Sequence, residues 1–175
     1  MRSIGEDNFM KRLPIILAIA VFALPLVLKA EQPTVRVAPV NLHGPRPLRE
    51  QTADAVVRDY LQSWQSMRAA LEQNRADLLD PEFVGVAHDK LADTVHDQAS
   101  LGIHTRYQDR AHDLQIVFYS PEGLSVQLID NVEYDEQVLS KDKVLATEHV
   151  RTRYIVVLTP AELRWRVRFF QASPE

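Results

Sequence analysis

The chain has 175 residues, of which 46% are hydrophobic and 25% are charged, so it is long enough for one domain with a substantial core. Its net charge of -4 at pH 7 argues against a nucleic-acid partner, since a phosphate-binding surface normally brings an excess of basic residues. The absence of cysteine excludes disulfides, thiol catalysis and thiolate metal sites, although it indicates no compartment.

An apolar run near the N-terminus predicts a membrane anchor or an export signal. Residues 13–28 are uncharged and almost wholly apolar, and they follow Lys11 and Arg12. As a helix the run would span roughly 24 Å, against a hydrocarbon core of ~30 Å. Ala30 suits the last residue before signal-peptidase cleavage, but Leu28 is larger than the small residue required two positions earlier. We favour an uncleaved anchor over residues 1–30, and cleavage with secretion to the periplasm is the alternative.

The charge around this run predicts the topology of the chain. Basic residues before an apolar segment remain in the cytoplasm, so everything after the run is expected in the periplasm or another extracytoplasmic space. The predicted location is the inner membrane, crossed once through residues 13–28. Residues 31–48 contain four of the ten prolines and have neither helical nor strand periodicity, which predicts an extended linker. Since Pro45 and Pro47 oppose a helix, the folded domain is expected over residues 49–172.

Two helices are predicted after the linker. The first begins near Arg49 and places one apolar stripe at spacings of three and four: Ala53, Val56, Val57, Tyr60, Leu61, Trp64, Met67 and Leu71. The second covers residues 82–100 and ends before Gly102, a typical helix stop. Its inward residues are expected to be Phe83, Val84, Ala87, Leu91, Val95 and Ala99. Both helices therefore have one face suited to covering a sheet.

After Gly102 the apolar period becomes two, which predicts two antiparallel hairpins. The first has Leu114, Ile116, Phe118, Leu124, Val126 and Leu128 inward, with its turn at residues 120–123. An acidic, loop-like stretch is expected near residues 137–143. The second hairpin turns at residues 159–162; a two-residue turn would place Tyr154, Val156 and Leu158 on one face with Leu163, Trp165, Val167 and Phe169. Trp64 and Trp165 are both expected to be mostly buried.

Helices followed by four antiparallel strands predict an α+β fold in which the helices cover a curved sheet. The segments YLQSW, TRYIVVL and WRVRFF resemble the nuclear-transport-factor-2-like superfamily of cone-shaped, cystatin-like domains, and the likeness covers residues 49–172. The nearest form is the intermembrane-space domain of chloroplast-division proteins, which also combines a tryptophan on the first helix with a final W-[KR]-[IV] strand. The superfamily contains enzymes, carriers and scaffolds, so the resemblance leaves function open.

Four histidines recur every eight residues: His88, His96, His104 and His112. On a helix this spacing gives a net rotation of ~80°, unlike the adjacent ligands of an i, i+4 metal motif. His104 is expected beyond the helix stop and His112 at the start of a strand. We therefore expect solvated rings on polar faces and loops, with no metal site and no cofactor.

The concave face of the predicted sheet carries the candidate catalytic residues. These are Asp130, Tyr134, Glu148 and Tyr154, with Tyr60 looking in from the first helix. A buried carboxylate beside a phenol could act as a general base with an oxyanion donor. However, Asp130 and Glu148 could equally lie at the open rim, and no dehydratase or hydrolase residue set can be assigned. An enzyme of the isomerase or dehydratase type therefore remains an alternative.

The opposite face of the second hairpin carries an arginine row: Arg151, Arg153, Arg164, Arg166 and Arg168. Like charges across a sheet repel, so something is expected to neutralise them. Glu133 and Asp135 on the preceding strand could pair with Arg151 and Arg153. Alternatively, Arg153, Arg164, Arg166 and Arg168 could bind an acidic protein surface or lipid headgroups, because arginine suits bidentate contacts.

The leading functional expectation is a membrane-tethered domain that binds another protein, with a homodimer through the sheet as a further expectation. The rival classes are an exported enzyme and a carrier of a small apolar ligand in the cone. An enclosed pocket with a carboxylate would favour the enzyme, an aliphatic pocket the carrier, and a filled cone the scaffold.

Overall fold

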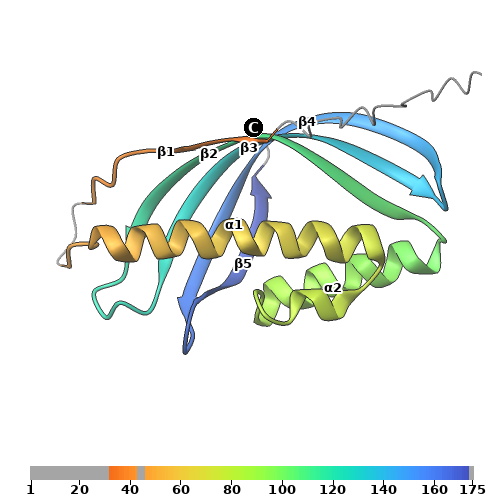
Figure 1. Ribbon diagram of the computed structural model, residues 1–175. Coiled ribbons are helices and arrows are strands. Elements are labelled where there is room, and N and C mark those ends of the chain that lie inside the picture. The colour runs from red at the N-terminus through yellow and green to blue at the C-terminus, as the bar shows by residue number, and fades with distance from the viewer. Residues whose placement is uncertain (1–31, 43–45, 174–175) are drawn as a thin grey trace, which may run out of the picture. The chain divides into compact units, whose positions relative to one another are not determined.

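The computed structural model describes residues 32–42 and 46–173, in which two helices pack on a five-stranded mixed sheet. The helical elements are α1 (Glu50–Gln73), the short 3-10 helix η1 (Ala76–Leu79) and α2 (Gly85–Ser100). The strands are β1 (Thr34–Val37), β2 (His104–Tyr119), β3 (Val126–Ser140), β4 (Lys143–Pro160) and β5 (Trp165–Ser173), and they lie side by side in this order. The sheet curves over α1 and α2, which lie on the same side of it (Figure 1).

The sheet has five strands, so the prediction of four was incomplete. The additional strand, β1, lies within the predicted linker and pairs in parallel with β2, Thr34 opposite Ala111 and Val37 opposite Leu114. Four residues are too few to display a period of two among prolines, and the pairing depends on backbone hydrogen bonds supplied by the distant edge of β2. The predicted anchor, residues 1–30, lies outside the described residues.

Helix α1 follows its predicted stripe and forms the centre of the core. Trp64 is 2% exposed and Tyr60 is 1% exposed, and they pack among buried residues of β2, β3 and β4. Trp165 on β5 is 9% exposed, so the prediction that both tryptophans are buried is confirmed. Asn74 ends the helix in the left-handed conformation, with φ 52°.

Helix α2 begins at Gly85, three residues later than predicted, because the preceding residues pair with β5. The amide of Val84 donates to the carbonyl of Val167 at 2.9 Å, and the amide of Val167 donates to Glu82 at 2.8 Å. At the other end of the helix, Gln98 is buried and Ala99 is exposed, which reverses the expectation for Ala99. Gln98 Nε2 donates to the carbonyl of Leu71, so a hydrogen bond holds this amide against α1.

The first hairpin has its turn where predicted, but two of its apolar residues are not in the core. Gly123 adopts φ 78° and donates its amide to Ser120 at 2.9 Å. Phe118 is exposed because the register shifts between Ile116 and Phe118, and this shift interrupts the alternation of faces. Leu124 is exposed in the connection between β2 and β3. The stretch 137–143 is not a loop: β3 and β4 continue through it to a tight turn at Lys141, which has φ 55°.

The second hairpin has a longer connection than the predicted two-residue turn. The amide of Ala161 donates to the carbonyl of Arg164 at 2.8 Å, and Leu163 is 90% exposed instead of inward. A register shift between Val157 and Leu158 brings Phe170, the neighbour of the predicted Phe169, against the core. The ring of Phe170 stacks on Tyr154 with centroids 4.5 Å apart.

Candidate functional site

Three polar side chains meet inside the fold and form the strongest candidate site, here called the Asp130 triad: Tyr60, His112 and Asp130. The phenol of Tyr60 donates to Asp130 Oδ2 at 2.7 Å, and His112 Nδ1 lies 2.7 Å from the same oxygen. A carboxylate only accepts hydrogen bonds, so this contact places a proton on Nδ1. Asp130 is 0% exposed, and Tyr60 and His112 are 1% exposed. The other carboxylate oxygen, Oδ1, is buried without a hydrogen-bond partner.

The position of His112 corrects the expectation of a solvated ring. Strand β2 begins at His104, eight residues earlier than expected, so His112 lies in the middle of a strand. It shares the inward face with Leu114 and Ile116, both of which are buried. Their alternation was visible in the sequence, and extending it back by one step would have placed His112 in the core.

Aromatic rings fill the space around the triad. The edge of Trp64 meets His112 with centroids 5.0 Å apart, and its ring also contacts Tyr134 at 5.8 Å and Tyr154 at 5.6 Å. Trp64 Nε1 donates to Asp109 Oδ1 at 3.0 Å, and the same carboxylate pairs with Arg68. The tryptophan is therefore held by packing and by one hydrogen bond, and it closes the interior over the triad.

The structure brings three of the four candidate catalytic residues together. Asp130 is opposite Tyr154 on β4, and Tyr134 lies further along β3, with its hydroxyl 3.4 Å from that of Tyr154. Glu148 is exposed near the far end of β4, where it is paired in register with Glu136. The alternative that these carboxylates lie at the open rim therefore holds for Glu148. It does not hold for Asp130, which is buried in the interior.

Burial determines the protonation of this aromatic interior. It raises the pKa of the Tyr60 hydroxyl well above its ordinary value, and the negative charge of Asp130 adds to the effect. Burial is also the first cause of the raised pKa values of Tyr107, Tyr134 and Tyr154. Burial, followed by repulsion from Glu148, raises the pKa of Glu136. These phenols are hydrogen-bond donors at neutral pH and are not bases.

The raised phenol pKa values predict a loss of stability in alkali. Each folded pKa lies above the unfolded value of about 10, so this contribution is complete below pH 10 and is lost as the pH rises through the folded pKa values. Absorbance at 295 nm and far-ultraviolet circular dichroism, recorded from pH 8 to 13, should show these tyrosines ionising together with unfolding. Ionisation of all five tyrosines with the circular dichroism unchanged would contradict the burial.

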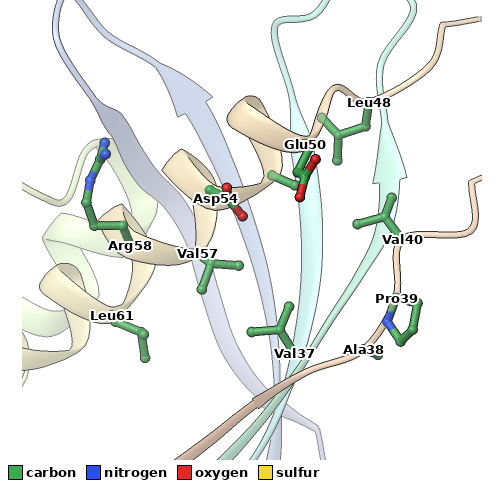
Figure 2. A pocket seen from close by; sticks show the side chains of 11 residues that line it. Val37, Ala38, Pro39, Val40, Leu48, Glu50, Asp54, Val57, Arg58 and Leu61 are labelled. Atoms are coloured by element: carbon green, nitrogen blue, oxygen red, sulfur yellow. The ribbon is translucent and has the colours of Figure 1, made fainter.

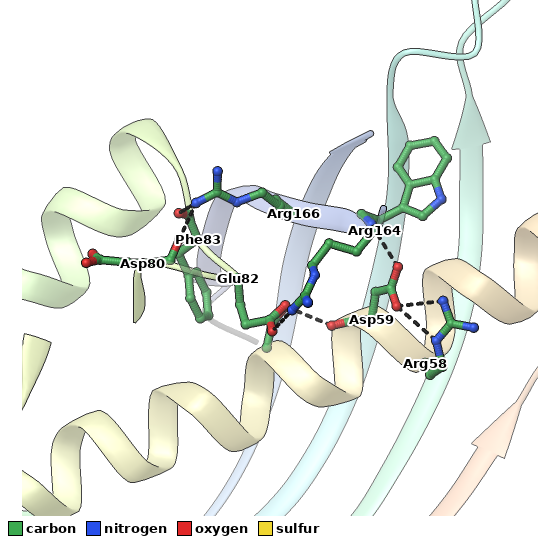
Figure 3. A network of polar contacts seen from close by, with 9 residues as sticks. Arg58, Asp59, Asp80, Glu82, Phe83, Arg164 and Arg166 are labelled. Atoms are coloured by element: carbon green, nitrogen blue, oxygen red, sulfur yellow. Dashed lines mark hydrogen bonds and ion pairs between the residues drawn. The ribbon is translucent and has the colours of Figure 1, made fainter. Parts of the chain in front are cut away.

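The arginine row is divided among several partners, and two of its members anchor β5 to the segment before α2. Arg164 Nη1 donates to Glu82 Oε1, and Glu82 is only 3% exposed. Arg166 donates to the carbonyl oxygens of Asp80 and Phe83 (Figure 3). Nearby, Asp59 Oδ2 accepts the amide of Trp165 at 2.7 Å. Arg164 and Arg166 therefore hold structural contacts.

The other arginines lie on strands β4 and β5. Arg151 pairs with Glu133 at 3.3 Å, as predicted. Arg153 instead donates to Asn131 at 3.0 Å, because the register places Asn131 opposite it and places Asp135 opposite His149. Asp135 pairs with Arg110 and His149. Hydrogen bonds from Arg110 and, less strongly, from His149 lower the pKa of Asp135. Arg153 and Arg168 are exposed.

Arg164 and Arg168 form a matched pair for testing the structural contact. We expect Arg164→Gln to lower the free energy of unfolding by about 1–2 kcal/mol, because Glu82 stays buried and loses its cation. The value is moderate because Arg164 itself is 44% exposed. Arg168→Gln, at an exposed position of β5, should change it by about 0.5 kcal/mol at most. Equal urea midpoints for the two variants would show that the Glu82 contact contributes nothing.

No group of three histidine, aspartate or glutamate side chains suited to a metal ion occurs in the part of the chain that the structure describes. His88 lies on α2 between Asp80 and Asp89, at 2.9 Å and 3.3 Å, and contact with Asp80 is the main cause of its raised pKa. His96 is exposed on α2, and His104 begins β2.

Over residues 32–42 and 46–173, no helix is long and apolar enough to cross a membrane.

Known proteins resemble this chain in structure. No family model and no curated protein matches its sequence. The intermembrane-space region of the chloroplast protein ARC6 superposes with a TM-score of 0.60 and 12% identity, over 74% of this chain and 100% of that one. A protein assigned as a scytalone dehydratase from Novosphingobium aromaticivorans gives 0.51 and 11%, over 72% and 89%. A protein assigned as a dehydratase of the nuclear-transport-factor-2-like family, from Streptomyces avermitilis, gives 0.51 and 9%, over 70% and 97%. The resemblance inferred from the sequence is confirmed at the level of the fold: the chain has the nuclear-transport-factor-2-like fold.

Proposed function

We propose that this protein is a membrane-tethered, extracytoplasmic domain that binds another protein and does not turn over a substrate. The observation that carries the proposal is the filled interior. Asp130, the best candidate for a general base, is 0% exposed beneath Trp64, and its two hydrogen-bonding partners are 1% exposed. A catalytic base must come within hydrogen-bond reach of its substrate, and a sealed carboxylate has no surface to offer one.

The tether and the location are proposed from the sequence. The apolar run 13–28 and the basic residues before it support a single crossing of the inner membrane, with the folded domain in the periplasm. The partner surface is proposed on the face of the sheet turned away from the helices, where Arg153 and Arg168 are exposed. A homodimer through the sheet is one form that such a partnership could take.

The experiment combines fractionation with crosslinking in intact membranes. Full-length protein should stay with the membranes during alkaline carbonate extraction and be degraded by protease added to spheroplasts. A photo-crosslinking amino acid placed at Arg168 should give a discrete heavier species, whose mass separates a second copy from another protein. A new N-terminus at Glu31 on all molecules would contradict the tether. The lack of a discrete crosslinked species at exposed positions over the whole domain surface would contradict the binding function.

A dehydratase-like enzyme is a second candidate, because one observation favours it. Asp130 Oδ1 is buried without a hydrogen-bond partner, and it lies next to a histidine and a phenol in a fold shared with proteins assigned as dehydratases. If the interior opened, this oxygen could accept a proton from a substrate. A thermal-shift screen with small hydroxylated ketones and phenols distinguishes the two candidates. Compounds that raise the Tm of the wild-type protein, but not that of Asp130→Asn, would favour the enzyme.

A further inference from the structure

A groove separate from the Asp130 triad runs between helix α1 and the segment 37–40, which includes the end of β1. It has a volume of about 810 Å³. Its floor and walls are mainly apolar, formed by Val37, Pro39 and Val40 on one side and by Leu48, Val57 and Leu61 on the other (Figure 2). This volume lies within the range of about 300–1,000 Å³ that is typical of ligand sites.

One side of the groove is an unpaired strand edge. Strand β1 is the outermost strand of the described sheet and pairs only with β2. The amide of Ala38 donates toward β2, to Leu114 at 2.8 Å. Successive backbone groups of a strand point to opposite edges, so the N–H groups of Val35 and Val37 point to the free edge. Val35 and Val37 are 41% and 49% exposed, and Val37 lines the groove.

The helical side of the groove carries unneutralised negative charge. Glu50 and Asp54 line it one turn apart on α1, and both are exposed. Neither has an ion-pair partner among the described residues. Arg58, a cation that also lines the groove, already pairs with Asp59 at 2.9 Å. A ligand with a positive charge would neutralise the two carboxylates together.

We propose that this groove binds an extended segment of a partner protein that adds to the free edge of β1. Alternate apolar side chains of the segment fill the groove, and a lysine or arginine meets Glu50 and Asp54. An acyl chain fits less well, because it has no backbone groups to pair with Val35 and Val37, and an anionic headgroup would be repelled by the carboxylates. The inference rests on the proposed protein-binding function and adds a second contact surface to it, at the free edge of β1, for a basic segment of the partner.

The test uses the full-length chain in mild detergent and a random nine-residue peptide library displayed on phage. Enriched peptides are expected to alternate apolar residues and to carry lysine or arginine. Synthetic copies are then titrated by fluorescence anisotropy. The double variant Glu50→Lys/Asp54→Lys should weaken their binding at least about tenfold and select acidic peptides instead. Asp93→Lys, an exposed change on α2, is the control and should alter neither result.

A backbone variant tests the strand pairing. Val35→Pro removes one N–H from the free edge, leaves the hydrogen bonds to β2 and keeps the side chains that line the groove, so it should weaken peptide binding about tenfold at an unchanged Tm. The absence of enriched peptides, or equal binding to the wild-type and Glu50→Lys/Asp54→Lys proteins, would overturn the inference. The crosslinking amino acid is also placed at Val40, which lines the groove. Crosslinks from Arg168 without any from Val40 would contradict binding in the groove but not the proposed function. The absence of crosslinks over the whole surface would contradict the proposed function itself.

Discussion

Trp64→Ala should lower the free energy of unfolding by about 3–5 kcal/mol, a large part of the ~5–15 kcal/mol of a typical domain. The indole contacts five aromatic rings from four strands, so its removal leaves a cavity that no single neighbour can fill. Urea unfolding, followed by circular dichroism, measures the change from the midpoint at a constant slope. A loss below about 1 kcal/mol would show that the interior closes around the cavity.

Trp64→Phe separates the packing from the hydrogen bond. Phenylalanine keeps an aromatic ring in the cluster but cannot donate to Asp109, whose carboxylate would then depend on Arg68. We expect this variant to lose about 1–3 kcal/mol, which is less than the alanine variant. If both variants lost the same amount, the hydrogen bond to Asp109 would account for the effect and the packing would not.

Asp130→Leu should cost about 3–5 kcal/mol, because it leaves the Tyr60 hydroxyl and His112 Nδ1–H buried without their shared acceptor. The triple variant Tyr60→Phe/His112→Phe/Asp130→Leu removes all three polar partners and should be more stable than Asp130→Leu alone. The reason is that losing one partner costs the desolvation of the others, whereas losing them all does not.

The same comparison distinguishes the two candidate functions. If the triad only satisfies itself inside a scaffold, the triple variant should keep the membrane crosslink at Arg168. If the triad is catalytic, the triple variant should lose the ligand-induced rise in Tm of the wild-type protein. The losses in free energy of unfolding are compared with those of the single variants Tyr60→Phe, His112→Phe and Asp130→Leu. If the loss of the triple variant equals the sum of the three, Tyr60, His112 and Asp130 do not act as a unit.

Local periodicity determined the main elements and the facing of many side chains. The stripe on α1 placed Tyr60 and Trp64 inward, and alternation on the strands placed Leu128, Asp130 and Val156 on the covered face. This succeeded because the periods of 3.6 and 2 follow from backbone geometry alone. Asp130 could therefore be identified as a candidate and Tyr60 placed on the same interior side, whereas the contact with His112 was not predicted. Glu148 was grouped with Asp130 because both have even numbers, although Glu148 lies at the rim.

Tertiary structure decided every feature that depends on distant backbone or side-chain partners. Strand β1 exists because β2 supplies its hydrogen bonds, and α2 starts late because Val84 pairs with Val167. Arg164 and its partner Glu82 are 82 positions apart, and Trp64 and its acceptor Asp109 are 45 apart. Such contacts leave no local pattern, because each partner alone is an ordinary polar residue. Only folding brings these partners together. The hydrogen bonds and ion pairs that they then form offset the free-energy cost of removing them from water.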